Sequence, residues 1–257
     1  MEVIVLARKP RQLSESGIYH IMLRGIDRQV IFQDDEDRQK FLQVLQDCKE
    51  ISLFRLYAYC LMDNHIHLLP RTDPKGESLE QIFKRIGVRY VAWYNRKYGR
   101  TGHLFQDRFL SEPVHNDAYL FTVLPYIHQN PVKAGICKNP GKYPWSSWRE
   151  YLHSSTLCDT QELLAMLSDD PEAAMETLRN LHKKPIDAPC LEMDQLRPSD
   201  REVRTLLLEL CGTNQIPDLQ GLSAEERSRI IQTLKLRQAS LRQISRLTGW
   251  PFGIVRK

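Results

Sequence analysis

Two apolar runs joined by a tight-turn pair constrain the fold of this chain more than any other feature. The run "FRLYAYCLM" (54–62) predicts one strand, and "HIHLLPR" (65–71) predicts a second. Asp63 and Asn64 stand between the runs, and such a pair is typical of a two-residue hairpin turn. The sequence therefore predicts an antiparallel hairpin whose second strand carries two histidines, one residue apart.

The segments around this hairpin complete an alternation of strands and helices. Apolar residues at 3.6-residue spacing mark the helices, and Ser78 with Gln81 forms the capping-box pattern that opens the longest one. The order β-α-β-β-α-β-α predicts an α+β fold, an antiparallel sheet with helices on one face. Besides the hairpin, we expect strands over 17–25 and 108–115, and helices over 35–51, 78–99 and 116–131, the last ended by Pro131.

The composition is ordinary for a soluble globular protein. Of the 257 residues, 42% are hydrophobic and 26% are charged, and the formal net charge of +4 permits a nucleic-acid partner without demanding one. No apolar run approaches the ~20 residues of a membrane helix, and "MEVIVLARKP" lacks the features of a signal peptide. The six cysteines are scattered without a CxxC pair, which predicts reduced thiols and a cytoplasmic location.

The character of the chain changes after residue 153, where tryptophan and tyrosine become scarce. We therefore expect a first domain over 1–153, a helical connector and linker over 154–200, and a helical C-terminal domain over 201–257. The sequence shows no internal repeat and no low-complexity tract that would suggest a repeat architecture.

The stretch "SLRQISRLTGWPFGIVRK" at the C-terminal end predicts a helix-turn-helix. Ile244 faces inward from the first helix, Gly249 lies in the turn, and the recognition helix begins near Pro251. A small helical hairpin without affinity for DNA is the alternative. The arginines expected to contact DNA phosphates here are Arg242, Arg246 and Arg256.

The two histidines of the hairpin form a candidate metal site. His65 and His67 point to one face of their strand, about 7 Å apart, and two such imidazoles can bind one divalent ion. Histidines at this spacing are also common as structural residues, so a third ligand is needed. Asn130, on the helix over 116–131, offers a carbonyl oxygen, and Tyr126 lies one turn away on the same face.

A tyrosine of ordinary pKa is a poor nucleophile, but a metal ion that polarises a phosphodiester makes attack by Tyr126 feasible. On spacing alone, a buried aromatic residue of an amphipathic helix is the better interpretation of Tyr126.

Five stretches of the chain resemble the IS200-like single-tyrosine HUH transposases, and in particular the branch of REP-associated tyrosine transposases. They occur in the family's order and cover about residues 8–152: "YHIMLRGIDRQVIF", "AYCLMDNHIHLL", "GHLFQDRFLSEPV", "YIHQNPVKAG" and "YPWSSW". "MEVIVL" precedes the resemblance, and we expect it to be either an upstream start-codon artefact or a poorly ordered tail.

The resemblance implies a ferredoxin-like (RRM-like) sheet that carries the histidine pair, in a catalytic domain over 1–153. It implies cleavage and rejoining of single-stranded DNA near hairpins through a 5′-phosphotyrosine intermediate, with Mg²⁺ or Mn²⁺ as cofactor. By matching positions, His65 and His67 are metal ligands, Tyr126 is the catalytic nucleophile, and Asn130 is a third ligand where relatives often have Gln. Pro125 departs from the family, whose members often have a basic residue there, and is expected to kink the helix.

Binding of single-stranded DNA requires a basic track with aromatic faces on which bases stack. The helix over 78–99 interleaves cations with aromatic residues, although a solvated basic face with its aromatic residues in the core explains this pattern equally well. The candidate DNA-binding residues of the whole chain are Arg24, Arg28, Arg85, Arg89, Arg108, Arg242, Arg246 and Arg256.

Two other functions are compatible with the sequence. The first is a catalytically silent DNA-binding regulator derived from such a transposase, which Pro125 and the helix-turn-helix favour. The second is a metal-dependent hydrolase of small substrates, which would show no salt-dependent affinity for DNA. The expected partners are single-stranded and hairpin DNA, with duplex DNA at the C-terminal region and no membrane. Nucleoid association is expected, and both monomer and homodimer remain open.

Overall fold

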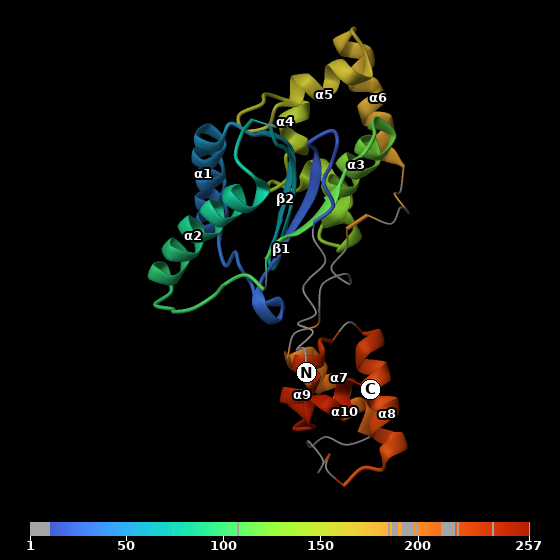
Figure 1. Ribbon diagram of the computed structural model, residues 1–257. Helices are drawn as coiled ribbons and strands as arrows, with labels where there is room; N and C mark the ends of the chain where they lie inside the picture. Colours follow the sequence, from blue (N-terminus) through green and yellow to red (C-terminus); the bar gives the residue numbers. More distant parts are fainter. Residues whose placement is uncertain are drawn as a thin grey trace. The chain divides into compact units, whose positions relative to one another are not determined.

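The computed structural model describes residues 11–73, 75–106, 108–184, 186, 190–191, 198, 200–211, 219, 221–237 and 239–256. The chain divides into two compact units, one within Met1–Gly25 and Val30–Leu191 and the other within Ile26–Gln29 and Glu192–Lys257. Figure 1 traces both units along the chain. The segment "MEVIVL" lies outside the described residues.

A four-stranded antiparallel sheet forms the centre of the first unit. Its strand order is β2-β3-β1-β4, so the strand with the histidines, β3, pairs with β2 on one side and with β1 on the other. A turn at Asp63 and Asn64 joins Met62 to its cross-strand partner His65, which confirms the predicted hairpin. The strands are β1 (Tyr19–Arg24), β2 (Arg55–Met62), β3 (His65–Arg71) and β4 (Leu110–Pro113).

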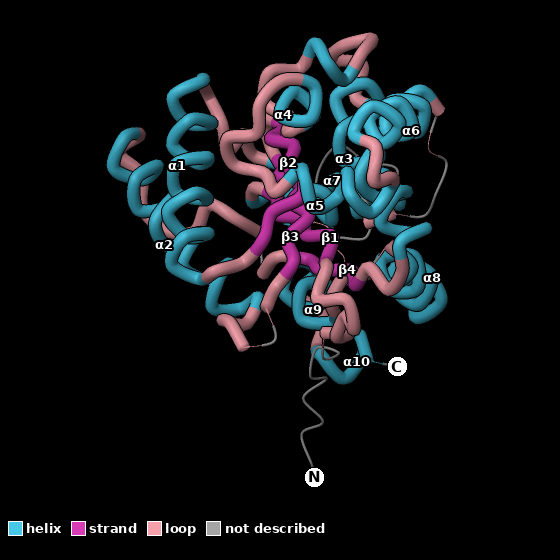
Figure 2. The backbone as a smooth tube through the Cα atoms, turned by 90° about the horizontal axis from the view of Figure 1, so that it is seen from above, coloured by secondary structure: helices cyan, strands magenta, loops and turns pink. Residues whose placement is uncertain are grey.

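Helices cover both faces of this sheet, so the expectation of helices on one face is wrong. α1 and α2 pack on the face that carries Leu68, and α3 packs on the face that carries Leu69. Figure 2 shows the strands between these two groups of helices. The physical reason lies in β2, whose side chains are buried on both faces from Leu56 to Met62 and therefore require cover on both. These helices are α1 (Asp35–Ser52), α2 (Leu79–Lys97) and α3 (Asp117–Lys133).

The predicted order of strands and helices is confirmed, and so is the start of the longest helix. Ser78 Oγ accepts from the Gln81 N–H at 3.3 Å, and Gln81 Oε1 accepts from the Ser78 N–H at 2.9 Å, which completes the capping box. α2 ends before Gly99, whose φ of +58° suits a residue without a Cβ.

The helix that carries Tyr126 extends past the proline that was expected to end it. α3 runs through both Pro125 and Pro131 and ends at Lys133. Pro131 cannot donate to the carbonyl oxygen of Ile127, but Asn130 Nδ2 lies 3.5 Å from that oxygen and replaces the missing donor. A helix can therefore continue for another half turn, because the freed carbonyl group is not left without a partner.

Four further helical elements follow the sheet, and most of them pack against the C-terminal half of α3. His128 Nδ1 lies 2.7 Å from His182 Nε2, and the His182 ring stacks on Trp148 with ring centroids 3.7 Å apart. Residues 154–191, expected to belong to a connector, are therefore part of the first unit. These elements are η2 (Pro140–Lys142), α4 (Trp148–Leu152), α5 (Thr160–Leu167) and α6 (Pro171–Lys183).

The burial of His182 predicts a loss of stability in acid. Burial lowers the pKa of His182 to about 4, against a weaker opposing hydrogen bond to the Leu178 carbonyl oxygen. The unfolded chain binds this proton at a pKa near 6.5. The contribution of neutral His182 to the free energy of unfolding is therefore fully present above pH 6.5 and is lost as the pH falls towards 4, by about 1.4 kcal/mol per pH unit.

We expect His182→Gln to flatten the decline in the free energy of unfolding between about pH 6.5 and pH 4, as measured by urea titration. The exposed His153 provides a matched control, since His153→Gln should leave the decline as steep as in the wild type. Equal slopes for wild type and His182→Gln would contradict the prediction.

The second unit has a helical core of its own. Ile244 and Trp250 are buried in it, and Trp250 Nε1 donates to the Leu219 carbonyl oxygen at 2.9 Å. Gly249, at a φ of +72°, separates the last two helices, which lie where the sequence places them. The helix-turn-helix interpretation of this pair stays a prediction. The helices are α7 (Asp200–Cys211), α8 (Ala224–Leu236), α9 (Leu241–Thr248) and α10 (Phe252–Arg256).

Among the described residues, no helix combines the length and the apolar character that crossing a bilayer requires. Nor does the structure join any of the six cysteines, all of which it describes, in a disulfide bond.

Candidate active site

His65 and His67 lie on the face of β3 that α3 covers. Their ring centroids are 5.1 Å apart, so the two imidazoles are brought together as the alternation along the strand predicts. His67 is buried, whereas His65 borders solvent at the start of the strand. The hairpin thus places one imidazole inside the protein and the other at its edge.

His65 is held by a neighbour in the turn and lies within reach of α3. His65 Nδ1 donates to Asn64 Oδ1 at 2.7 Å, which leaves the lone pair of the neutral ring on Nε2. Burial and the positive charge of Arg24 lower the pKa of His65 to about 4, while a hydrogen bond with Asn130 acts in the opposite direction. His65 is therefore neutral at pH 7, the state in which an imidazole binds a metal ion.

His67 is surrounded by side chains from three elements. His67 Nδ1 lies 2.9 Å from Nε2 of His20, a fully buried residue of β1. Burial, together with the charges of His65, His20 and Lys133, holds the pKa of His67 well below its ordinary value. His67 is consequently neutral as well.

Tyr126 projects from α3 towards the two buried histidines. Its ring packs edge-on against His67 and His20, with centroids 6.0 and 5.8 Å away. Lys133 Nζ lies 4.3 Å from the centroid of the Tyr126 ring, two helical turns along the same face. The Tyr126 hydroxyl donates to the carbonyl oxygen of Leu191 at 3.4 Å, and only 3% of the residue is exposed.

The donor set fits a small divalent ion. Two neutral imidazoles and an amide oxygen are ligands that Mn²⁺ accepts, and Asn130 is turned so that its Nδ2 donates to the Tyr126 carbonyl oxygen at 3.0 Å. Its Oδ1 and the Nε2 lone pair of His65 are therefore the atoms left for an ion. The described residues contain no group of three His, Cys, Asp or Glu that could hold a metal, so a site here depends on the Asn130 amide.

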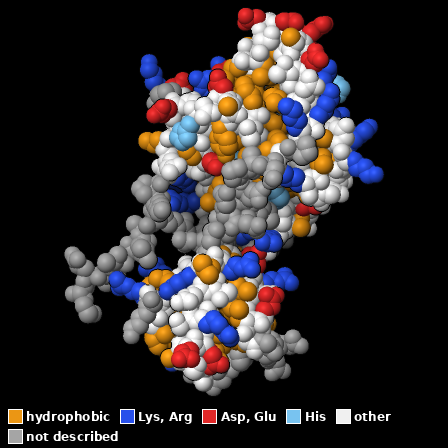
Figure 3. Space-filling view, turned by 90° about the vertical axis from the view of Figure 1, so that its right-hand side faces the viewer, with side chains coloured by type: hydrophobic (Ala, Val, Ile, Leu, Met, Phe, Trp, Pro, Cys, Tyr) orange, Lys and Arg blue, Asp and Glu red, His pale blue; other side chains and the backbone are white. Residues whose placement is uncertain are grey.

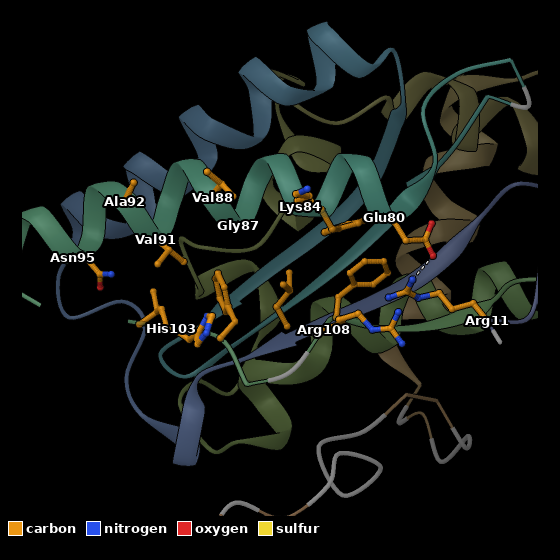
Figure 4. A pocket seen from close by; sticks show the side chains of 15 residues that line it. Arg11, Glu80, Lys84, Gly87, Val88, Val91, Ala92, Asn95, His103 and Arg108 are labelled. Atoms are coloured by element: carbon orange, nitrogen blue, oxygen red, sulfur yellow. Dashed lines mark hydrogen bonds and ion pairs between the residues drawn. The ribbon is translucent and has the colours of Figure 1, made fainter. Parts of the chain in front are cut away.

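A separate pocket lies on the opposite face of the sheet, against α2. Its volume is about 700 Å³, and Leu23 of β1 forms part of its wall. Figure 4 shows Lys84 and Arg108 at this pocket and the Arg11 guanidinium directed towards Glu80. The other lining residues are mostly apolar: Phe83, Gly87, Val88, Val91, Ala92, Asn95, His103, Leu104, Phe105 and Phe109.

The arginines proposed for DNA contact lie in different environments in the first unit. Arg24 is buried, with its guanidinium bound to Gln106 Oε1 at 2.7 and 3.1 Å. Arg85 binds Glu77 at 2.6 Å, whereas Arg89 and Arg108 are exposed. On the face seen in Figure 3, acidic side chains gather where α5 leads into α6, and Lys and Arg side chains lie on the flanks.

The remaining candidate arginines belong to the second unit. Arg28 lies in the 3-10 turn η1 (Ile26–Arg28), which groups with that unit. Arg242 and Arg256 are exposed, and Arg246 makes a two-point ion pair with Asp200, at 2.5 and 2.8 Å.

Three residues near this site were not identified from the sequence. His20 alternates with Met22 and Arg24 along β1, so its face could have been assigned once that strand was placed beside β3. Lys133 lies seven residues after Tyr126, a spacing that repeats on one helical face. Leu191 follows the sheet by many residues, and no local pattern places it against Tyr126.

Part of the chain is similar to proteins that are already known. Residues 14–130 match the family model described as "Transposase IS200 like". A protein of Haemophilus influenzae with the provisional name REP-associated tyrosine transposase is 26% identical over 148 residues, which cover 54% of this chain and 83% of that protein.

A solved structure of a REP-associated tyrosine transposase bound to a REP hairpin is similar in fold, with a TM-score of 0.50 and 17% identity. The match covers 57% of this chain and 85% of that one. Residues 14–130, which hold both histidines, Tyr126 and Asn130, are therefore similar to the IS200-like transposase family, and the chain resembles the REP-associated branch of that family.

Proposed function

We propose that this protein is a DNA strand transferase that cleaves and rejoins single-stranded DNA near hairpins, with Tyr126 as the nucleophile. The observation that carries this proposal is the convergence of one phenol and two neutral imidazoles from different elements, with Tyr126 edge-on to His67 and Asn130 close enough to His65 to affect its pKa. The similar structure bound to a REP hairpin supports hairpin DNA as the ligand.

The reaction exchanges one phosphodiester for another. The Tyr126 oxygen forms a bond to phosphorus while the bond from phosphorus to the 3′ oxygen breaks, and the phenol proton is balanced by the proton that the 3′ oxygen gains. The products are a 5′-phosphotyrosine and a free 3′-hydroxyl, which can react in reverse without an added energy source. A bound Mg²⁺ or Mn²⁺ ion would withdraw charge from the phosphate, and His65, His67 and Asn130 would hold it.

The Tyr126 hydroxyl must exchange partners before it can attack. It now donates to the Leu191 carbonyl oxygen in a buried position, where a phosphate has no access. DNA binding therefore has to displace the chain at Leu191 from Tyr126. On this proposal, the hydrogen bond between Tyr126 and Leu191 belongs to a closed form of the active site.

The pocket on α2 suits the single-stranded part of the substrate. Its floor is apolar and includes Phe83 and Phe109, while Lys84 and Arg108 add positive charge at the same place. A nucleotide requires this combination, because its base is apolar on both faces and its phosphate is negatively charged. The C-terminal unit, with exposed Arg242 and Arg256, would add contacts to duplex DNA in a nucleoid-associated cytoplasmic protein.

An end-labelled hairpin oligonucleotide with single-stranded flanks tests the proposal in the presence of Mn²⁺. Attack by Tyr126 leaves the downstream strand joined to the protein, so a 3′ label should migrate with the protein on a denaturing gel. A 5′ label should appear instead on a shortened free strand that ends in a 3′-hydroxyl.

Three results would contradict strand transfer by a tyrosine. Cleavage with neither label on the protein would indicate hydrolysis by a metal-activated water. Salt-dependent hairpin binding without cleavage would indicate the catalytically silent regulator instead. Protein with no affinity for DNA at low salt would favour a hydrolase of small substrates.

A further inference from the structure

Three titratable side chains from three adjacent strands form a row, which we call the Glu112–His20–His67 row. Glu112 on β4 lies opposite His20 on β1, and Met22, two residues further along β1, lies opposite His67 on β3. His20 and His67 are therefore diagonal neighbours on one face of the sheet. His20 Nε2 lies 2.9 Å from His67 Nδ1, and His20 Nδ1 lies 3.8 Å from Glu112 Oε2.

The burial of His20 calls for an explanation. The residue is fully buried, and its Nδ1 has no hydrogen-bond partner among the described residues. A buried polar atom without a hydrogen-bond partner destabilises the folded state, so packing alone would favour an apolar side chain at this position. The group that faces this nitrogen is the half-buried Glu112 carboxylate, which also accepts from the Leu191 N–H at 3.1 Å.

Glu112 is ionised at neutral pH. Burial acts to raise the pKa of Glu112, but the nearby side chains of His20 and Tyr119 and the hydrogen bond from the Leu191 N–H outweigh burial, so that the pKa is lowered. An ionised carboxylate has no proton to donate and can only accept.

This charge decides which nitrogen of each histidine in the row carries the proton. The carboxylate lies 3.8 Å from His20 Nδ1, beyond hydrogen-bond distance, but its charge favours the tautomer in which neutral His20 has its proton on Nδ1 and its lone pair on Nε2. His20 then accepts from the Nδ1–H of His67, whose own lone pair lies on Nε2. In metal sites, the second nitrogen of a ligating histidine is bound in this way by a carboxylate or another acceptor, which fixes the tautomer and the ring orientation.

We propose that Glu112 and His20 are positioning residues, which hold His67 in one tautomer so that its Nε2 is presented to a divalent ion. The inference rests on the proposed function to the extent that His67 is a metal ligand. His65 is held differently, by Asn64 within its own hairpin, and borders solvent. One histidine is thus fixed across three strands, whereas the other depends on its turn.

Glu112→Gln tests the row with little change of size. Glutamine removes the charge that favours a proton on His20 Nδ1. His20 can then carry its proton on Nε2 and donate to His67 Nδ1, which moves the His67 proton to Nε2, the atom required for the metal. We expect Mn²⁺ affinity, measured by calorimetric titration of the full chain, to fall about 10- to 100-fold. In the metal-free protein, the ¹⁵N shifts of the His67 ring should show the loss of a single Nδ1–H tautomer.

Glu162→Gln is the matched control. Glu162 has a similar exposure, at 34% against 27% for Glu112, but binds Arg71 at 2.5 Å, and its replacement should leave Mn²⁺ affinity and the His67 signals unchanged. His20→Gln should weaken Mn²⁺ binding to the same degree as Glu112→Gln. If His20→Gln does not fold, Glu112→Gln decides the question alone.

An unchanged His67 tautomer and unchanged Mn²⁺ affinity in Glu112→Gln would overturn the inference, as would an equal loss in Glu162→Gln. Neither the Mn²⁺ titration nor the His67 signals require DNA. The positioning role of the row can therefore be refuted independently of strand transfer. A wild-type protein that binds Mn²⁺ through this row but forms no covalent product would refute strand transfer alone. One that forms the product, with His67 unaffected in Glu112→Gln, would refute the row alone.

Discussion

Replacement of Tyr126 by phenylalanine is expected to abolish the covalent protein–DNA product and to leave hairpin binding intact. The substitution removes the hydroxyl that donates to Leu191 and keeps the ring that packs against His20 and His67. Without a nucleophilic oxygen at this position, no phosphotyrosine can form, so the loss should be complete rather than partial. The 3′-labelled oligonucleotide on a denaturing gel measures it directly, and gel-shift titration measures binding.

Tyr143→Phe is the control for loss of a buried tyrosine hydroxyl. Tyr143 donates to the Leu61 carbonyl oxygen at 2.6 Å and is not part of the histidine site, so its replacement should preserve the covalent product. A labelled band of wild-type intensity in Tyr126→Phe would show that another group is the nucleophile.

Removal of either histidine should also reduce cleavage strongly, because it weakens the proposed metal site rather than removing the nucleophile. His65→Ala and His67→Ala each remove one of two imidazoles from the proposed metal site, and charge stabilisation by such an ion is worth several kcal/mol. We therefore expect the rate of cleavage in Mn²⁺ to fall by about 10³-fold or more. Single-turnover assays at several Mn²⁺ concentrations measure this rate without interference from product release.

The double variant distinguishes a shared site from two independent effects. Ligands that act on one ion are not additive, so His65→Ala combined with His67→Ala should cleave no more slowly than either single variant. The exposed His115 serves as the control, and His115→Ala should retain wild-type activity. Losses of cleavage rate that multiply in the double variant would contradict a common metal site. His65 borders solvent, so His65→Ala remains informative even if His67→Ala is unstable.

The parts of the fold that depend on neighbouring residues could be predicted from the sequence. The hairpin at Asp63 and Asn64 follows from turn chemistry, and the start of α2 follows from the reciprocal hydrogen bonds of Ser78 and Gln81. The position of Asn130 near His65 follows from helical spacing once Tyr126 is placed at the site. In each case a local interaction determines the outcome.

Features that depend on distant residues were missed or wrongly predicted. The second helical layer is needed because β2 is buried on both faces. The nearly continuous apolar run of β2 indicates this burial, but the prediction of helices on one face did not take it into account. His20 meets His67 across 47 residues, and strand order decides that contact. The end of α3 was placed too early because the side chain of Asn130 compensates for Pro131, an interaction that proline statistics do not include.

The contacts between α3 and the end of α6 bear on how the nucleophile is aimed. Gln129 Nε2 donates to the carbonyl oxygens of His182 and Lys184, both at 2.9 Å, and so opposes rotation of α3 about its axis. That rotation decides whether Tyr126 faces the histidines. The brace therefore comes from residues beyond the segment 14–130 that matches the family model. A chain truncated at residue 152 would contain every stretch that resembles the family and yet leave its tyrosine unsupported.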